Sequence, residues 1–138
     1  MRWDDSDFRK LTEKVIGCFF EVHNQLGPGF LELAYSRSLT KELMLNFSLV
    51  EPEREFPVMY KGDIVSSYKP DIVVENSVII EVKAVREINE HHIAQLLAQL
   101  RATEIIIGFL VNFSKKSLEF KRYDNFYLLE KKGLLLFD

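Results

Sequence analysis

The sequence predicts one α/β domain with a mixed β-sheet and the element order ααβββαββ. Three observations support this prediction. Apolar residues recur at helical spacing in two N-terminal segments and one central segment. Short apolar runs bounded by turn residues lie between and after these helices. The chain has 138 residues, of which 47% are hydrophobic, and this suits a single domain with a sizeable core.

Two helices are predicted at the start of the chain. Asp5 or Ser6 can cap the first helix, and Gly27-Pro28 ends it. The second helix runs from about Phe30 to Leu45. Residues at helical spacing form the apolar stripe of the first helix: Phe8, Leu11, Val15, Cys18, Phe19, Val22 and Leu26.

Three strands are predicted next. Glu55–Tyr60 is the first, and Lys61-Gly62-Asp63 turns the chain. Ile64–Glu75 is the second, interrupted near Pro70, and Val78–Val85 is the third. Because the second and third are apolar on nearly both faces, we expect them in the centre of a sheet that is covered on both sides.

The second half adds a helix, two strands and a tail. Asn89–Ala102 is the helix, and Glu104–Asn112 and Leu118–Tyr123 are the strands. The domain core therefore spans about residues 5–123, and residues 124–138 form a C-terminal tail with two apolar clusters. Four residues form the predicted buried stripe of the helix: Ile93, Leu96, Leu97 and Leu100.

Charge and cysteine content narrow the class of protein. The net charge of −3 differs from that of a strongly basic nucleic-acid binder. Lys115 to Lys132 is locally basic, either as a solvated surface or as a patch that contacts phosphates. A single cysteine, Cys18, indicates a cytoplasmic protein. The longest apolar run, Ile105 to Val111, is too short to cross a membrane.

Glu32 is a charged residue on an apolar helix face. On a helical wheel it shares a stripe with Tyr35, Leu39 and Leu43. A carboxylate in that position needs a cation, a metal ion or hydrogen-bond donors, unless it lies at the rim and reaches solvent.

Glu81 and Lys83 interrupt the apolar strand Val78–Val85. Residues two apart on a strand share a face, so the carboxylate and the ammonium group lie side by side. They form either a structural ion pair, an edge that faces water, or part of a site.

The position of Asp71 relative to Glu81 depends on the loop that joins the two strands. A two-residue loop, Asn76-Ser77, would point Asp71 away from Glu81. A three-residue loop that begins at Glu75 pairs Val74 with Val78 and places Asp71 opposite Glu81. We predict the second register. Two carboxylates that close repel each other, and a divalent cation such as Mg²⁺ or Mn²⁺ removes the repulsion.

His92, Gln95 and Gln99 form a polar stripe beside the leucines of the third helix. The stripe is either a solvated helix face or a surface on which Gln95 lies over the carboxylates.

Together these residues resemble a known pattern. Pro70-Asp71 followed by Glu81-Val82-Lys83 resembles the PD-(D/E)XK nuclease superfamily. The segment Gly29 to Tyr35, with Glu32 between them, is similar to the signature of its GxxExxY branch, and the likeness extends from about Thr12 to Arg122.

The resemblance implies a restriction-endonuclease-like core, in which helices flank a mixed sheet and the acidic site lies on the central hairpin. Asp71 and Glu81 would be metal ligands, with Glu32 reaching the same metal directly or through water. The Val82 carbonyl would add an oxygen. Lys83 would position water or stabilise the transition state. Gln95 matches the glutamine of the exonuclease-like branches.

Three more residues are candidates for contact with the substrate or with the site residues: Tyr35, His92 and Gln99. The exonuclease-like branches often carry a tyrosine at the position of Gln99, a difference expected to alter substrate contacts without touching the metal ligands.

Two functions follow from these residues. The first is a nuclease that uses Mg²⁺ or Mn²⁺ to hydrolyse phosphodiester bonds, in DNA rather than RNA. The second is a non-catalytic nucleic-acid-binding or assembly module that retains the fold. In the second case the apolar C-terminal tail, Phe126 to Phe137, would contact a protein partner or a second copy of the chain.

Overall fold

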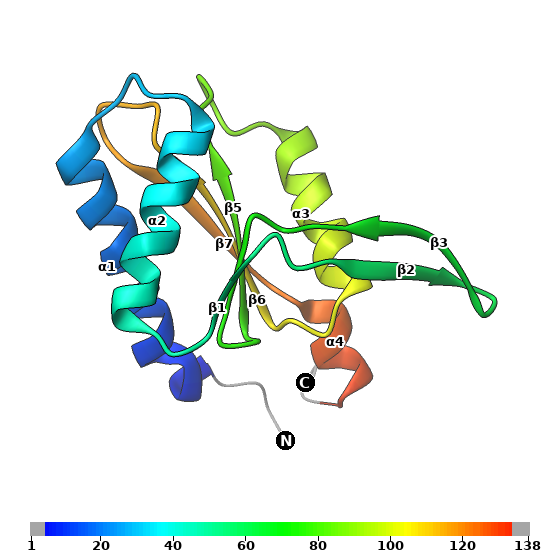
Figure 1. Cartoon of the computed structure of the whole chain (residues 1–138). Helices are drawn as coiled ribbons and strands as arrows, with labels where there is room; N and C mark the ends of the chain where they lie inside the picture. Colours follow the sequence, from blue (N-terminus) through cyan, green and yellow to red (C-terminus); the bar gives the residue numbers. More distant parts are fainter. Residues whose placement is uncertain (1–4, 134–138) are drawn as a thin grey trace.

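The computed structural model describes residues 5–133 and contains a five-stranded mixed sheet (Figure 1). The strand order is β1-β4-β5-β6-β7. β5 and β6 are parallel, and every other neighbouring pair is antiparallel. The strands are β1 (Val50–Pro52), β4 (Ile72–Val74), β5 (Val78–Lys83), β6 (Ile107–Asn112) and β7 (Glu119–Asp124).

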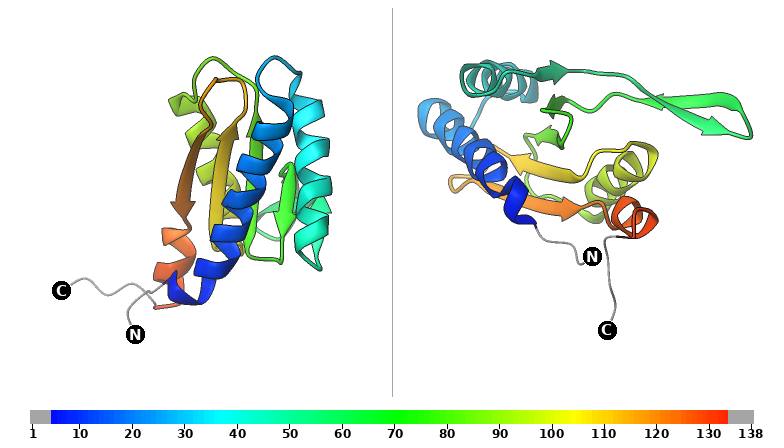
Figure 2. Two further views of the ribbon diagram at one scale, coloured as in Figure 1. Left: turned by 90° about the vertical axis from the view of Figure 1, so that its left-hand side faces the viewer. Right: turned by 90° about the horizontal axis from the view of Figure 1, so that it is seen from below.

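Helices cover both faces of this sheet, as the view from below in Figure 2 shows. α1 (Arg9–Leu26) and α2 (Glu32–Asn46) lie on one face. α3 (Glu90–Ala102) and the short α4 (Phe126–Lys131) lie on the other. The predicted α/β class, with a mixed sheet flanked by helices, is confirmed.

Alternate side chains of the central strands form two apolar layers, one on each face of the sheet. Val74, Ile80 and Phe109 pack with α1 and α2, whereas Val73 and Ile79 pack with α3. All five are completely buried. β4, β5 and β6 are therefore covered on both sides, as their nearly continuous apolar sequences predicted.

The predicted strand Ile64–Glu75 is wrong in part, because its two halves belong to different sheets. Its second half contains β4. Its first half belongs to β3 (Asp63–Tyr68), which pairs with β2 (Phe56–Tyr60) in a separate two-stranded hairpin. This hairpin projects away from the five-stranded sheet past α3 (Figure 1), so most of β3 is exposed and not central.

Other boundaries differ where the elements are short. A 3₁₀ turn, Asp5–Phe8, precedes α1, so Phe8 and not Asp5 or Ser6 is the N-cap residue of the α-helix. β1 was not predicted. The described part of the tail includes α4, and residues 134–138 of the predicted tail lie outside the described residues. Leu97, expected in the buried stripe of α3, is 41% exposed.

The hairpin between β4 and β5 has the predicted register. Val74 pairs with Val78 and Ile72 with Ile80. Two of the loop residues, Glu75 and Asn76, adopt left-handed backbone conformations, with φ angles of 51° and 52°. One oxygen of the Glu75 carboxylate accepts hydrogen bonds from two backbone N–H groups that precede β1, which ties the loop to the edge of the sheet.

Candidate active site

Asp71 and Glu81 lie directly beside each other at one end of the β4–β5 hairpin. Asp71 lies one residue beyond the pair Ile72–Ile80 and so faces Glu81 across the two strands. Its backbone N–H donates to Glu81 Oε1 at 3.3 Å. Its carboxylate Oδ2 accepts from the Val82 N–H at 2.7 Å. The backbone at Asp71 thus holds the Glu81 carboxylate, and the β5 backbone at Val82 holds the Asp71 carboxylate.

The protein environment holds this pair at a cost in electrostatic energy. Burial first, and then the Asp71 carboxylate, raise the pKa of Glu81 from 4.5 to about 8, against the lowering effect of Lys83 and hydrogen bonds. Burial likewise raises the pKa of Asp71, and the negative charge of Glu32 adds to this. Two negative charges are therefore costly at this pair, of which Glu81 is buried and Asp71 half-buried.

Lys83 supplies a cation beside the pair. It lies two residues after Glu81 on β5, hence on the same face of the strand, and it is half-buried. Its positive charge lowers the pKa of both Asp71 and Glu81. The pKa of Glu81 still lies well above 4.5, so the Lys83 charge only partly offsets the effects of burial and of Asp71.

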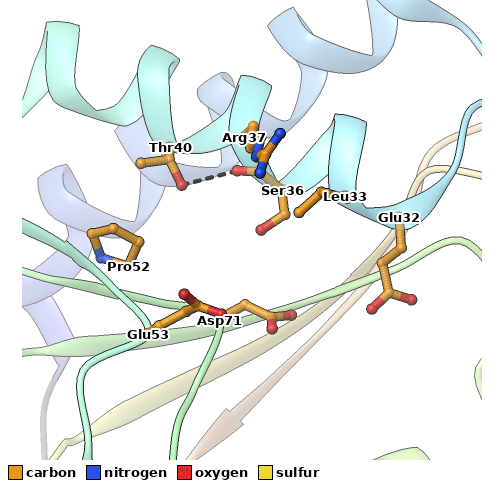
Figure 3. A pocket seen from close by; sticks show the side chains of 8 residues that line it. All are labelled: Glu32, Leu33, Ser36, Arg37, Thr40, Pro52, Glu53 and Asp71. Atoms are coloured by element: carbon orange, nitrogen blue, oxygen red, sulfur yellow. Dashed lines mark hydrogen bonds between the residues drawn. The ribbon is translucent and has the colours of Figure 1, made fainter.

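Glu32 reaches the same site from α2. It is the first residue of that helix, it is exposed, and it lines a cavity of about 610 Å³ together with Asp71. Figure 3 shows the Glu32 and Asp71 side chains pointing toward each other across this cavity. Glu32 is thus a rim residue that reaches solvent, and it also faces the acidic pair.

Tyr35 anchors the loop that leads to Glu32. Its ring is completely buried and stacks on Phe113, with centroids 4.9 Å apart. Its hydroxyl donates to the Gly27 carbonyl at 2.6 Å and accepts from the Phe30 N–H at 3.1 Å. Full burial removes Tyr35 from contact with a substrate, so its hydroxyl acts by fixing the start of α2.

The polar stripe of α3 approaches the site from the other face of the sheet. Gln99 is 9% exposed, and its side chain lies close enough to Glu81 to lower the pKa of that carboxyl group. Gln95, one turn earlier, is exposed. Its expected role near the carboxylates therefore stays a prediction. Position 99 was expected to leave the candidate metal ligands untouched; the Gln99 side chain instead lies beside Glu81, one of those candidates.

His92 is held in one orientation at the N-terminus of α3. Its ring Nδ1 accepts from the Asn89 backbone N–H at 3.1 Å, and the His92 backbone N–H donates to Asn89 Oδ1. Burial and the nearby Lys83 charge lower its pKa. A neutral ring whose Nδ1 is an acceptor carries its proton on Nε2, which leaves that N–H available as a donor.

The sequence interpretation missed two residues near the site. Arg37 lines the cavity and forms no ion pair with any residue in the described range 5–133. Asn112 is completely buried at the end of β6, opposite Lys83, and its side chain bonds both the N–H and the carbonyl of Val85. A polar residue that ends an apolar strand is a signal that would have indicated Asn112; an exposed arginine carries no such signal.

The comparison with protein families decides the classification. The sequence matches the PD-(D/E)XK nuclease superfamily over residues 9–123. The chain belongs to this superfamily. No curated protein and no solved structure matches it. The match covers the sheet, the three long helices and every predicted site residue, and the fold is that expected of a restriction-endonuclease-like protein.

PD-(D/E)XK nucleases typically use divalent metal ions, and the donor chemistry of this site fits one. Carboxylate oxygens are the hard ligands that Mg²⁺ and Mn²⁺ prefer. Burial and the neighbouring carboxylates raise the pKa of Asp71 and of Glu81, and a bound cation would offset both effects. Within residues 5–133 no three His, Cys, Asp or Glu side chains form a closed metal cluster.

None of the helices between residues 5 and 133 combines the length and the apolar character needed to cross a bilayer. Cys18, which suggested a cytoplasmic location, is buried against the sheet, and the location itself stays a prediction.

Proposed function

We propose that this protein is a nuclease that depends on Mg²⁺ or Mn²⁺ and hydrolyses phosphodiester bonds, in DNA rather than RNA. The observation that carries the proposal is the pair Asp71 and Glu81, where two negative charges are costly and Lys83 lies beside them. We further propose that the chain belongs to the GxxExxY branch. The structural roles found for Glu32 and Tyr35 support this assignment.

In this proposal the metal ligands are Asp71, Glu81 and the Val82 carbonyl. Glu32, on the opposite wall of the cavity, contributes through water. The cation, when bound, supplies Lewis-acid chemistry at the scissile phosphate and offsets its negative charge. The interlocking hydrogen bonds of Asp71 with Glu81 and Val82 fix the two ligands before any substrate arrives.

Lys83 acts on the attacking water and on the charge that develops during the reaction. Its ammonium group lies on the same strand face as Glu81 and has three N–H donors. A fixed cation near the phosphate stabilises the additional negative charge of the transition state. Gln95 and the Nε2–H of His92 are further donors on the α3 side of the site.

The substrate backbone would lie in the cavity between α2 and the chain segments at the end of β1 and just before β4. Ser36, Arg37 and Thr40 form its α2 wall, and Arg37 is the cation there. Arginine binds phosphate groups through its planar set of N–H donors. A backbone phosphate held by Arg37 would place the neighbouring phosphates close to Asp71.

A specific observation also favours an assembly role through the described part of the tail. Leu128 and Leu129 of α4 pack against the body of the protein, whereas Phe126 and Tyr127 are 59% and 57% exposed. Two exposed aromatic side chains suit contact with a partner protein or a second copy of the chain. Molar mass by light scattering tests this: a dimer that Phe126→Ser disrupts supports it, and a monomer at all concentrations contradicts it.

The nuclease proposal is tested with labelled linear and circular DNA, single-stranded and double-stranded, and with RNA. Each substrate is incubated with Mg²⁺, Mn²⁺ or EDTA. Cleavage that requires metal supports the proposal, and the preferred substrate identifies the nucleic acid. Loss of linear but not circular substrates indicates cleavage from ends. Absence of cleavage in every reaction contradicts the proposal.

A further inference from the structure

Gln99 is buried next to a proposed metal ligand. It lies on α3, which packs across the opposite face of the sheet from α2, and only 9% of the residue is exposed. Its side-chain amide lies beside the Glu81 carboxyl group and lowers the pKa of that group. The Glu81 carboxylate thus accepts from the backbone N–H of Asp71, just before β4, and has a second polar neighbour in Gln99 on α3.

The other end of the Gln99 amide has no partner. Its Oε1 is buried and accepts no hydrogen bond from any residue in the described part of the chain. A buried carbonyl oxygen without a donor lowers the stability of a protein. A glutamine retained only for folding would have both ends of its amide satisfied, and an apolar side chain of similar size would avoid the cost. The contact with Glu81 is therefore the feature that explains an amide at this position.

We propose that Gln99 is a positioning residue that orients the Glu81 carboxylate for metal binding. This inference rests on the proposed function, because it concerns the same metal site. Carboxylates that bind metals are themselves held by hydrogen bonds, and loss of such a partner weakens metal binding. Gln99 does not contact substrate in this account; it acts through Glu81.

The experiment measures Mn²⁺ binding to the metal-free full chain without nucleic acid, by calorimetry and by the electron paramagnetic resonance signal of free Mn²⁺. Gln99→Leu should weaken binding by about 10-fold to 100-fold. Gln25→Leu makes the same chemical change at an exposed position of α1 and should leave the affinity unchanged. Asp71→Asn removes a ligand and should abolish binding.

Unfolding by urea separates positioning from a structural role. Metal-free Gln99→Leu should unfold at a urea concentration close to that of wild type, because removal of the unpaired oxygen offsets the lost contact with Glu81. Gln99→Met, with a more adaptable side chain, is made in parallel. If neither variant folds, Gln99 is structural and the inference is overturned.

Two further results distinguish the inference from the proposed function. Normal affinity in Gln99→Leu, together with loss of binding in Asp71→Asn, overturns the inference and leaves the metal site in place. Mn²⁺ binding that Asp71→Asn does not reduce overturns both.

Discussion

Replacing Glu81 by glutamine should stabilise the metal-free protein at alkaline pH while it removes metal binding. Glutamine keeps the shape of the side chain and an oxygen for the Asp71 N–H, but it has no charge. The pKa of Glu81 is raised from 4.5 to about 8, mainly by burial and by the neighbouring Asp71 carboxylate. The folded protein therefore binds this proton more tightly than the unfolded chain does.

Because the folded protein binds this proton more tightly, its stability falls as the pH rises. Stability due to the bound proton is fully present below pH 4.5 and is lost as the pH rises toward about 8. At about 1.4 kcal/mol per pH unit, the rise in the Glu81 pKa from 4.5 to about 8 limits the lost stability to about 5 kcal/mol. Because water can enter the open cavity and Lys83 lies nearby, we expect a gain of about 2–4 kcal/mol for Glu81→Gln at alkaline pH.

The assay is urea unfolding in EDTA, followed by circular dichroism at about pH 5.5 and about pH 8.5. The advantage of Glu81→Gln over wild type should increase between these two values. Saturating Mn²⁺ should then stabilise the wild type alone and reduce or reverse the difference.

Glu119→Gln is the matched control, because hydrogen bonds from Asn112 and Lys115 lower the pKa of Glu119. This substitution should destabilise the protein at about pH 8.5. An advantage of Glu81→Gln that does not grow with pH would refute the account of a strained acidic pair.

Three other substitutions test the loop before α2, the proposed phosphate contact and the packing of α3 on the sheet. Tyr35→Phe leaves two loop backbone groups without their partner and should lower the free energy of unfolding by about 1–3 kcal/mol in urea titrations, whereas Tyr127→Phe, at an exposed position, should not. Arg37→Ala should weaken binding of nucleic acid, with a fall of about 1 in the slope of log affinity against log salt and no change in Mn²⁺ affinity. Gly108→Ala places a Cβ 3.0 Å from Leu96 Cδ1 and should cost about 1–3 kcal/mol of stability in urea unfolding.

The sequence was most informative where local geometry decides the outcome. The three-residue loop after β4 sets the pairing of β4 with β5, so the position of Asp71 opposite Glu81 followed from counting residues. Helical periodicity likewise placed Glu32 on the side of α2 that faces the sheet. These positions depend on a few neighbouring residues, and the predicted acidic pair was correct for that reason.

Long-range packing decided the features that the sequence did not reveal. Ile64 and Val65 have strand-forming side chains, but they are exposed because they belong to the projecting β2–β3 hairpin. The chain returns to the main sheet only after Pro70, at β4. Gln95 and Gln99 lie one turn apart on one helix face, so spacing alone cannot show which one reaches Glu81. That depends on where α3 crosses the sheet, which no local pattern encodes.

The central claim is that Asp71 and Glu81 bind a divalent cation and that Lys83 serves the reaction beside it. The most direct test measures Mn²⁺ affinity and DNA cleavage in parallel for wild type, Asp71→Asn and Lys83→Met. We predict that Asp71→Asn loses both Mn²⁺ binding and DNA cleavage. Lys83→Met should still bind Mn²⁺ but cleave DNA at least about 100-fold more slowly than wild type. Cleavage at the wild-type rate by either variant, or undiminished Mn²⁺ affinity in Asp71→Asn, would contradict the claim.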